Sequence, residues 1–405
     1  MEQTTKILFD LLIILAAAKI MGELFERLGQ PVVIGEILAG VLLGPYVFGL
    51  ISPFHAETFH VYQILAEIGV IILLFTIGLH TKVDEMLSVG RTSTMVAVLG
   101  VILPFFFGYL YTLTSEHSTV EAMFIGAAMV ATSVGITARV FADLKILDSQ
   151  VAKVIVGAAV IDDILGLLVL GVVTGVGSGA ISYLKITLLT LEAIGFVLFL
   201  IILSKRLVGR MGPASLSFFK LKNAPFALAL LFCLGLSAVA SYIHLAAIVG
   251  AFMAGMVLAE LNLEYKFSVK FDSLYDFLVP FFFVVMGTQV DLSVFTKLNL
   301  IGAALVLTLF AVLGKLIGCG LGAWGMGLKQ AAVVGVGMVP RGEVGMIVAS
   351  IGLGMGVIST DLYSVVIFMV IATTLMTPPI LAKMVSRKYV KMKEEEKMEE
   401  IPVDL

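Results

Sequence analysis

The chain has 405 residues, of which 60% are hydrophobic and only 14% are charged, and its formal net charge is −3. Its mean hydropathy of +1.10 lies far from that of a soluble globular protein and excludes that class. The composition predicts an all-α membrane protein that crosses the lipid bilayer many times. We expect no nucleic acid among its binding partners.

Thirteen segments have about the length and apolar character that a transmembrane helix needs. Lysine and arginine gather in or beside alternate connections between them, so the positive-inside rule places the N-terminus outside and the C-terminus in the cytoplasm of the inner (plasma) membrane. We expect one transmembrane domain over 1–386 and a charged cytoplasmic tail over 387–405. The approximate segments are 5–26, 31–50, 61–79, 93–113, 121–141, 151–176, 183–203, 224–243, 245–261, 275–289, 299–325, 330–352 and 362–385.

Two runs in the first half of the chain match two runs in the second half, in the same order. Residues 34–43 align with 249–258, and residues 129–135 align, with one insertion, with 338–345. The second segment thereby pairs with the ninth, and the fifth with the twelfth. Because seven is an odd offset, matched segments cross in opposite directions, which is the inverted-topology repeat of many secondary transporters.

The second and third segments each contain a carboxylate, Glu36 and Glu67. Neither has a counterpart near the helix breaks described next, so we expect packing or gating roles for both.

The fifth and twelfth segments share residues that weaken a helix at mid-membrane. Unwound backbone at this depth is tolerated only where it is buried in protein or lines a cavity. We therefore predict two discontinuous helices that meet near a midplane site, although small residues also serve close helix packing. The residues are Thr132, Ser133 and Gly135 in the fifth segment, and Pro340, Gly342 and Gly345 in the twelfth.

The sixth segment carries two adjacent aspartates, Asp162 and Asp163, inside an apolar stretch where neither reaches water by snorkelling. An ionisable group at bilayer depth costs about 2.5–3.5 kcal/mol on insertion scales and is by default a functional-site candidate. Adjacent helical residues point about 100° apart, so one aspartate can face a partner while the other faces a water-filled cavity.

Lys315, deep in the eleventh segment, is the natural partner of one aspartate, because a buried lysine without a partner loses its proton. The alternative is that Lys315 snorkels from an overlong helix. In the twelfth segment, Arg341 and Glu343 pair with each other or with partners elsewhere; a structural network and direct ion contact are both open.

These motifs together resemble the cation:proton antiporter-2 family, and within it the NapA-type bacterial sodium/proton antiporters. The resemblance covers nearly the whole chain, from Gln30 to the last segment. The residues that carry it are the runs 131–139 and 157–163, Gly314-Lys315, and Pro340-Arg341-Gly342-Glu343-Val344-Gly345.

The resemblance implies a homodimer in which each protomer has thirteen spans, a scaffold (about 5–88 and 224–292), a linker helix (183–203) and an elevator-type core (about 93–177 and 297–386). It implies exchange of Na⁺ or Li⁺ for H⁺, with Asp163 binding either ion and with Asp162, Thr132 and Ser133 beside the cation. It also implies an Asp162–Lys315 ion pair in the cation-free state and electrogenic transport, without a cofactor.

Alternatives from other classes remain at this point. A K⁺/H⁺ antiporter or K⁺ efflux transporter belongs to the same superfamily, although Gln commonly precedes Asp at the aspartate site of the efflux systems. An intramembrane aspartyl protease needs two carboxylates that share a proton, and adjacent side chains on one helix diverge. A passive channel suits inverted broken helices less well than alternating access does. We therefore expect a transporter rather than an enzyme.

Overall fold

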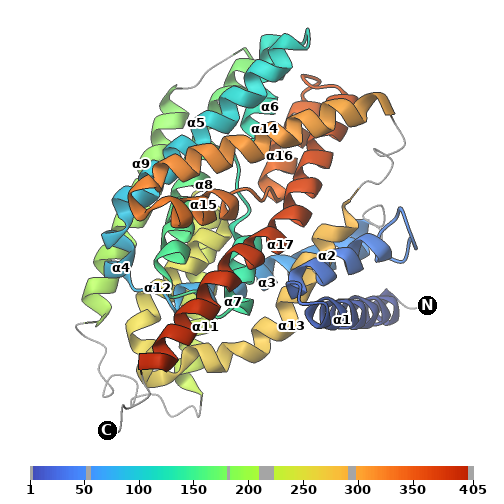
Figure 1. The fold of residues 1–405 in the computed structure, drawn as a ribbon. Helices are drawn as coiled ribbons and strands as arrows, with labels where there is room; N and C mark the ends of the chain where they lie inside the picture. Colours follow the sequence, from blue (N-terminus) through green and yellow to red (C-terminus); the bar gives the residue numbers. More distant parts are fainter. Residues whose placement is uncertain (1–2, 52–55, 180–182, 209–222, 291–297, 400–405) are drawn as a thin grey trace.

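A computed structural model describes residues 3–51, 56–179, 183–208, 223–290 and 298–399, and within these ranges the regular structure is helical, without strands (Figure 1). The elements in chain order are α1 (Gln3–Arg27), α2 (Val32–Leu43), α3 (Ala56–Gly78), α4 (Val83–Ser88), α5 (Gly90–Thr114), α6 (Thr119–Ala128), α7 (Val134–Asp143), α8 (Gln150–Gly177), α9 (Tyr183–Val208), α11 (Ala224–Tyr242), α12 (Ala247–Tyr265), α13 (Phe267–Thr288), α14 (Leu298–Gly322), η2 (Trp324–Met326), α15 (Leu328–Gly337), α16 (Glu343–Gly354) and α17 (Thr360–Glu399).

Six helices in the described residues are long and apolar enough to cross a membrane by themselves. Each of the thirteen expected segments lies on a helix, and the fifth and twelfth are each divided into two short helices. The six long apolar helices are Thr58–Gly78, Gly90–Thr114, Gln150–Gly177, Ala224–Tyr242, Leu300–Gly322 and Thr360–Val385.

Several helix boundaries differ from the expected segments: α3 begins earlier, at Ala56, and α17 ends later, at Glu399, within the expected tail. Two further differences have a local cause. The second segment was expected over 31–50, but α2 ends at Leu43, because Gly44 precedes Pro45 and is extended (ψ 174°), as a residue before proline prefers. The tenth segment was expected from 275, but α13 begins at Phe267. Its first turns carry exposed charged side chains, such as Lys270 and Asp272, so an apolar pattern does not reveal them.

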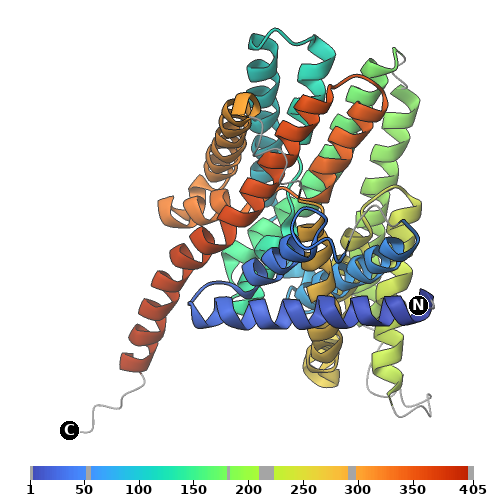
Figure 2. The ribbon, with the colours of Figure 1, turned by 90° about the vertical axis from the view of Figure 1, so that its right-hand side faces the viewer.

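The long helices pack in two groups (Figures 1 and 2). We call the first group the α3 bundle: α3 packs against α12 and α13, and α1, α2 and α11 join them. The second group is the α5 bundle, in which α5 packs against α6, α8 and α14, and α15–α17 join through α14 and α6. Helix α9 contacts both α8 and α12, and α7 touches α2 and α3 as well as α8 and α17.

The α3 bundle repeats the same close helix contacts at matched glycines. A Cβ added at Gly35 would lie 2.3 Å from the Met21 carbonyl oxygen, and one at Gly250, its aligned counterpart, 2.3 Å from that of Leu236. At Gly40 the added Cβ would lie 2.1 Å from the Val284 carbonyl oxygen, and at the aligned Gly255 it would lie 2.2 Å from that of Phe75. These matched contacts are what an internal repeat predicts.

Gly255→Ala tests this packing. We expect it to lower the free energy of unfolding by about 1–3 kcal/mol, because the new methyl group meets backbone that cannot move aside cheaply. Gly235 in α11 is the matched control, since a Cβ there meets nothing within 4 Å, and alanine there is expected to be neutral or up to about 1 kcal/mol stabilising. Thermal unfolding of the purified protein in detergent measures both, and equal effects would contradict the close-contact account.

Candidate functional site

Two unwound segments meet in the interior. The first lies between the end of α6 at Ala128 and the start of α7 at Val134, and the second lies between the end of α15 at Gly337 and the start of α16 at Glu343. They are hydrogen-bonded to each other: the Ser133 amide donates to the Pro340 carbonyl (2.8 Å), and the Thr132 hydroxyl donates to the Met338 carbonyl (3.4 Å). Both breaks occur where the helix-weakening residues predict them.

Local sequence explains why the two segments approach so closely. A Cβ added at Gly342 would lie 2.7 Å from the Ser133 side chain, so the contact requires glycine. Thr132 and Ser133 are buried, and the Thr137 hydroxyl, one turn into α7, donates to the Gly337 carbonyl. The crossing thus gathers hydroxyls and backbone carbonyls freed from helix hydrogen bonding, which are oxygen ligands of the kind hard cations prefer.

Arg341 is completely buried and holds the second unwound segment through backbone carbonyls. Its guanidinium donates to the carbonyls of Val339 (2.7 Å), Met338 (3.4 Å) and Ala311 of α14 (3.2 Å). The first two carbonyls follow the C-terminal end of α15, where the helix dipole favours a positive charge. The backbone of Arg341 is bonded on both sides by α17, since its amide donates to the Thr373 hydroxyl and its carbonyl accepts from the Thr374 hydroxyl.

The hydrogen-bond partners of Arg341 favour a structural network. The side chain of its other predicted partner, Glu343, lies outside the described residues, and only its backbone is placed, as the first residue of α16. Sequence reasoning did not identify Thr373 and Thr374. Their only signal is a run of hydroxyl residues, completed by Thr377, in the last apolar segment.

Lys315 and Asp162 form a buried ion pair between α14 and α8. The Lys315 Nζ lies 3.0 Å and 3.1 Å from the two Asp162 carboxylate oxygens, and the two side chains are 0% and 1% exposed. Snorkelling of Lys315 is therefore excluded. Helix α5 passes close by, because a Cβ at Gly100 would lie 3.5 Å from Lys315 Nζ. The pair is joined to the crossing through α14, where Ala311 accepts from Arg341 one turn before Lys315.

The neighbouring Asp163 has different surroundings. It is partly exposed, whereas Asp162 is buried, as expected for adjacent side chains that diverge by about 100° on one helix. Asp162 is therefore the aspartate that pairs with Lys315, whereas Asp163 lies in a different, partly exposed environment.

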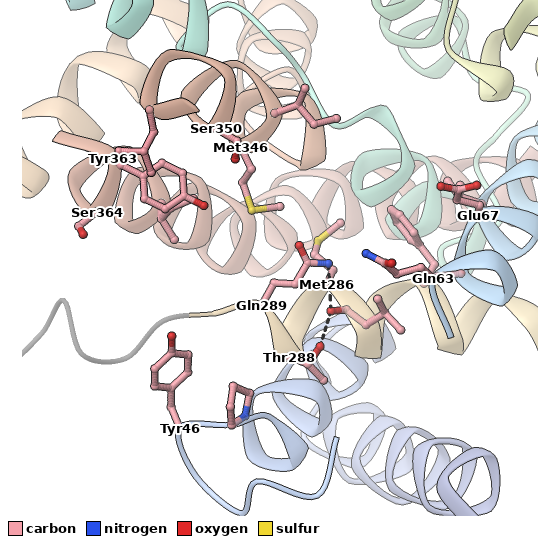
Figure 3. Close-up of a pocket in the computed structure, with 18 of the residues that line it drawn as sticks. Tyr46, Gln63, Glu67, Met286, Thr288, Gln289, Met346, Ser350, Tyr363 and Ser364 are labelled. Carbon is pink, nitrogen blue, oxygen red and sulfur yellow. Dashed lines mark hydrogen bonds between the residues drawn. The ribbon is translucent and has the colours of Figure 1, made fainter. Parts of the chain in front are cut away.

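A cavity of about 650 Å³ lies between the two bundles (Figure 3). It is lined by α3, α13, α16, α17 and the loop after α2, and the carboxyl side chain of Glu67 is exposed in its wall. Its inner wall includes Val70 and Phe282, which lie 3.5 Å and 3.6 Å from the position of a Cβ on Gly135. Val70 and Phe282 thus form a layer between the cavity and the first turn of α7, which directly follows Thr132 and Ser133. Sequence reasoning did not locate this cavity.

Comparison with known proteins agrees with this architecture. The family model for sodium/hydrogen exchangers, transmembrane, matches residues 12–386. A high-affinity Na⁺/H⁺ antiporter of Synechocystis is 35% identical, over 92% of this chain and 88% of the relative. The Na⁺/H⁺-K⁺ antiporter GerN of Bacillus cereus is also 35% identical, over 92% of this chain and 95% of the relative.

Among solved structures, a sodium proton antiporter of Methanocaldococcus jannaschii shares the fold. The TM-score is 0.70 at 18% sequence identity, and the match covers 96% of this chain and 98% of that one. Together with the family model, which spans nearly the whole chain, these similarities establish that the chain belongs to the transmembrane sodium/hydrogen exchanger family.

Proposed function

We propose that this protein exchanges Na⁺ or Li⁺ for H⁺ across a plasma membrane by alternating access, with Asp163 as the exchanging carboxylate. The observation that carries the assignment is the Asp162–Lys315 ion pair, because it occupies one aspartate and leaves Asp163 in a separate, partly exposed environment. One carboxylate does not hold a proton and a metal cation together. If the core changes the side of the membrane to which Asp163 is open only when Asp163 holds a proton or a metal cation, the fluxes of H⁺ and the cation are coupled.

The hydroxyls of Thr132 and Ser133 and the freed carbonyls of the crossing supply the remaining oxygen ligands in this proposal. Asp162 joins them when the cation enters, and this displaces Lys315. Loss of the Lys315 proton at that step would move extra charge and make the exchange electrogenic. Arg341 keeps the unwound segment in place because its positive charge offsets the partial negative charge at the C-terminal end of α15. We assign Glu343 to the same network.

The two bundles suggest how access alternates. We assign residues of about 5–88 and 224–292, which contain the α3 bundle, as a scaffold. We assign about 93–177 and 297–386, which contain the α5 bundle and α7, as a moving core, and the helix over 183–203 as their linker. Thirteen spans, inverted repeats, a homodimer formed by the scaffold and a cytoplasmic tail over 387–405 belong to the same proposal. With the N-terminus outside, the cavity is the outer entrance to Asp163.

Potassium is the second candidate cation, because the 35%-identical relative GerN is named as a Na⁺/H⁺-K⁺ antiporter. Reconstituted liposomes with an internal pH dye separate the candidates. We expect external Na⁺ or Li⁺ to drive proton efflux at a rate that changes when valinomycin and K⁺ clamp the membrane potential. A response to K⁺ alone would select the potassium alternative, a response independent of voltage would remove electrogenicity, and no response to any of the three cations would overturn antiport.

A further inference from the structure

A charge cluster with a buried arginine and a buried glutamate at its centre joins the two bundles through α7. The guanidinium of Arg139, on α7, lies 3.5 Å from a carboxylate oxygen of Glu36 on α2 and over the ring of Tyr275 on α13, 5.0 Å from its centroid. Its Nε also lies 3.0 Å from a carboxylate oxygen of Asp143, one turn further along α7. Glu36 is 1% exposed and Arg139 6%. We call these four residues the Arg139 cluster.

The cluster lies on the opposite side of the helix crossing from the cavity. On α2, Glu36 is near the first turn, whereas Pro45 and Tyr46, after the last turn, line the cavity. At about 1.5 Å per helical residue, the stretch of α2 from Glu36 to its end at Leu43 alone separates the two sites by about 10 Å. On α13, Tyr275 likewise precedes the cavity-lining residues 282–289. On α7, Gly135 touches the cavity wall and Arg139 follows one turn later.

The contacts of the cluster are incompletely satisfied. Glu36 Oε2, Arg139 Nη1 and the Tyr275 hydroxyl are buried atoms without a hydrogen-bond partner, and Arg139 Nε has its ion-pair contact with Asp143 but no aligned hydrogen bond. The Asp162–Lys315 pair in the same protein is different, since both of its carboxylate oxygens receive a hydrogen bond. A buried network that is only partly satisfied gives little net stabilisation, because desolvation of the charges offsets their attraction. Such a contact can form in one state and separate in another at small cost.

We propose that Arg139 is a positioning residue for the exchange: its contact with Glu36 and Tyr275 holds α7 against the α3 bundle while the cavity is open, and it separates when the cavity closes. The inference rests on the proposed alternating access. It adds the residues that close the protein on the side opposite the cavity while the cavity is open. A ligand can shift a two-state equilibrium only by the difference in its interaction with the two states, and the same holds for a side-chain contact.

Labelling of a cavity cysteine tests the proposal. Ser350 lines the cavity and is exposed, whereas the native Cys233 and Cys319 are buried (Figure 3). A membrane-impermeant maleimide is therefore expected to react with a Ser350→Cys variant in proteoliposomes. Adding Glu36→Gln, which keeps the side-chain size, should slow this reaction several-fold because the cavity-open state loses a contact.

Arg139→Gln should slow the reaction similarly, and the double change should be no slower than the slower single change, because both remove one contact. The matched control is Arg27→Gln, which breaks an exposed Glu23–Arg27 pair within α1 (2.7 Å) and should leave the labelling rate unchanged. If the Arg139→Gln variant fails to fold, the labelling rate of the Glu36→Gln variant alone tests the proposal.

An unchanged or faster labelling rate in folded Glu36→Gln would overturn the role of the cluster. Proton exchange in the same vesicles keeps the two proposals distinct. Exchange with unchanged labelling rejects only this inference, whereas absence of exchange in the unsubstituted protein rejects the proposed function.

Discussion

Asp163→Asn is expected to reduce Na⁺-driven proton movement to the rate of protein-free liposomes. Asparagine has nearly the size of aspartate, but it takes up no proton and carries no charge to bind a cation, so both halves of the exchange are lost together. The protein should remain folded, with a free energy of unfolding within about 1 kcal/mol of the parent, because Asp163 is partly exposed and is not the aspartate paired with Lys315.

The measurement is dye-reported proton flux in liposomes, accompanied by thermal unfolding in detergent. Asp148→Asn is the matched control, since Asp148 is an exposed aspartate in the loop before α8. It should leave both the flux and the melting temperature unchanged. Retained Na⁺-dependent flux in folded Asp163→Asn would remove Asp163 from the exchanging role and move the assignment to Asp162.

The features that sequence reasoning located were those with a local cause. Pro340 and Gly342 disfavour a regular helix whatever the tertiary packing around them, so the break between α15 and α16 was predictable. A lysine buried deep in an apolar segment requires an anion, and the chain offers an aspartate pair at the same depth, so a contact of Lys315 with one of the two aspartates followed from the sequence. The family resemblance assigned that contact to Asp162, as the structure has it.

The features that it missed depend on how distant helices pack. Nothing near Arg341 in the sequence indicates that its guanidinium binds backbone carbonyls, one of them from Ala311 in another helix. Glu36 was expected to serve packing or gating, but its contact with Arg139 arises only when α2 and α7 meet. The cavity is likewise a gap between bundles. Its wall combines residues such as Glu67 and Ser350 from helices that are far apart in sequence.

Asp162→Asn and Lys315→Met are each expected to destabilise the protein by about 3–5 kcal/mol, because each leaves the other partner as an uncompensated buried charge. The double variant should recover most of that loss, since two neutral side chains of similar size need no ionic partner. The two single losses sum to about 6–10 kcal/mol, so recovery of most of that loss corresponds to a coupling energy of about 5 kcal/mol or more in the double-mutant cycle, measured by thermal or denaturant unfolding in detergent.

Transport separates this structural coupling from a role of Lys315 in moving charge. With Asp163 intact, the double variant should still exchange Na⁺ for H⁺, but its rate should no longer respond to a valinomycin clamp, because the proton carried by Lys315 is gone. Additive destabilisation would show that the two residues do not depend on each other. Unchanged voltage dependence would show that Lys315 only stabilises the fold, and electrogenic exchange would then require another proton-carrying group.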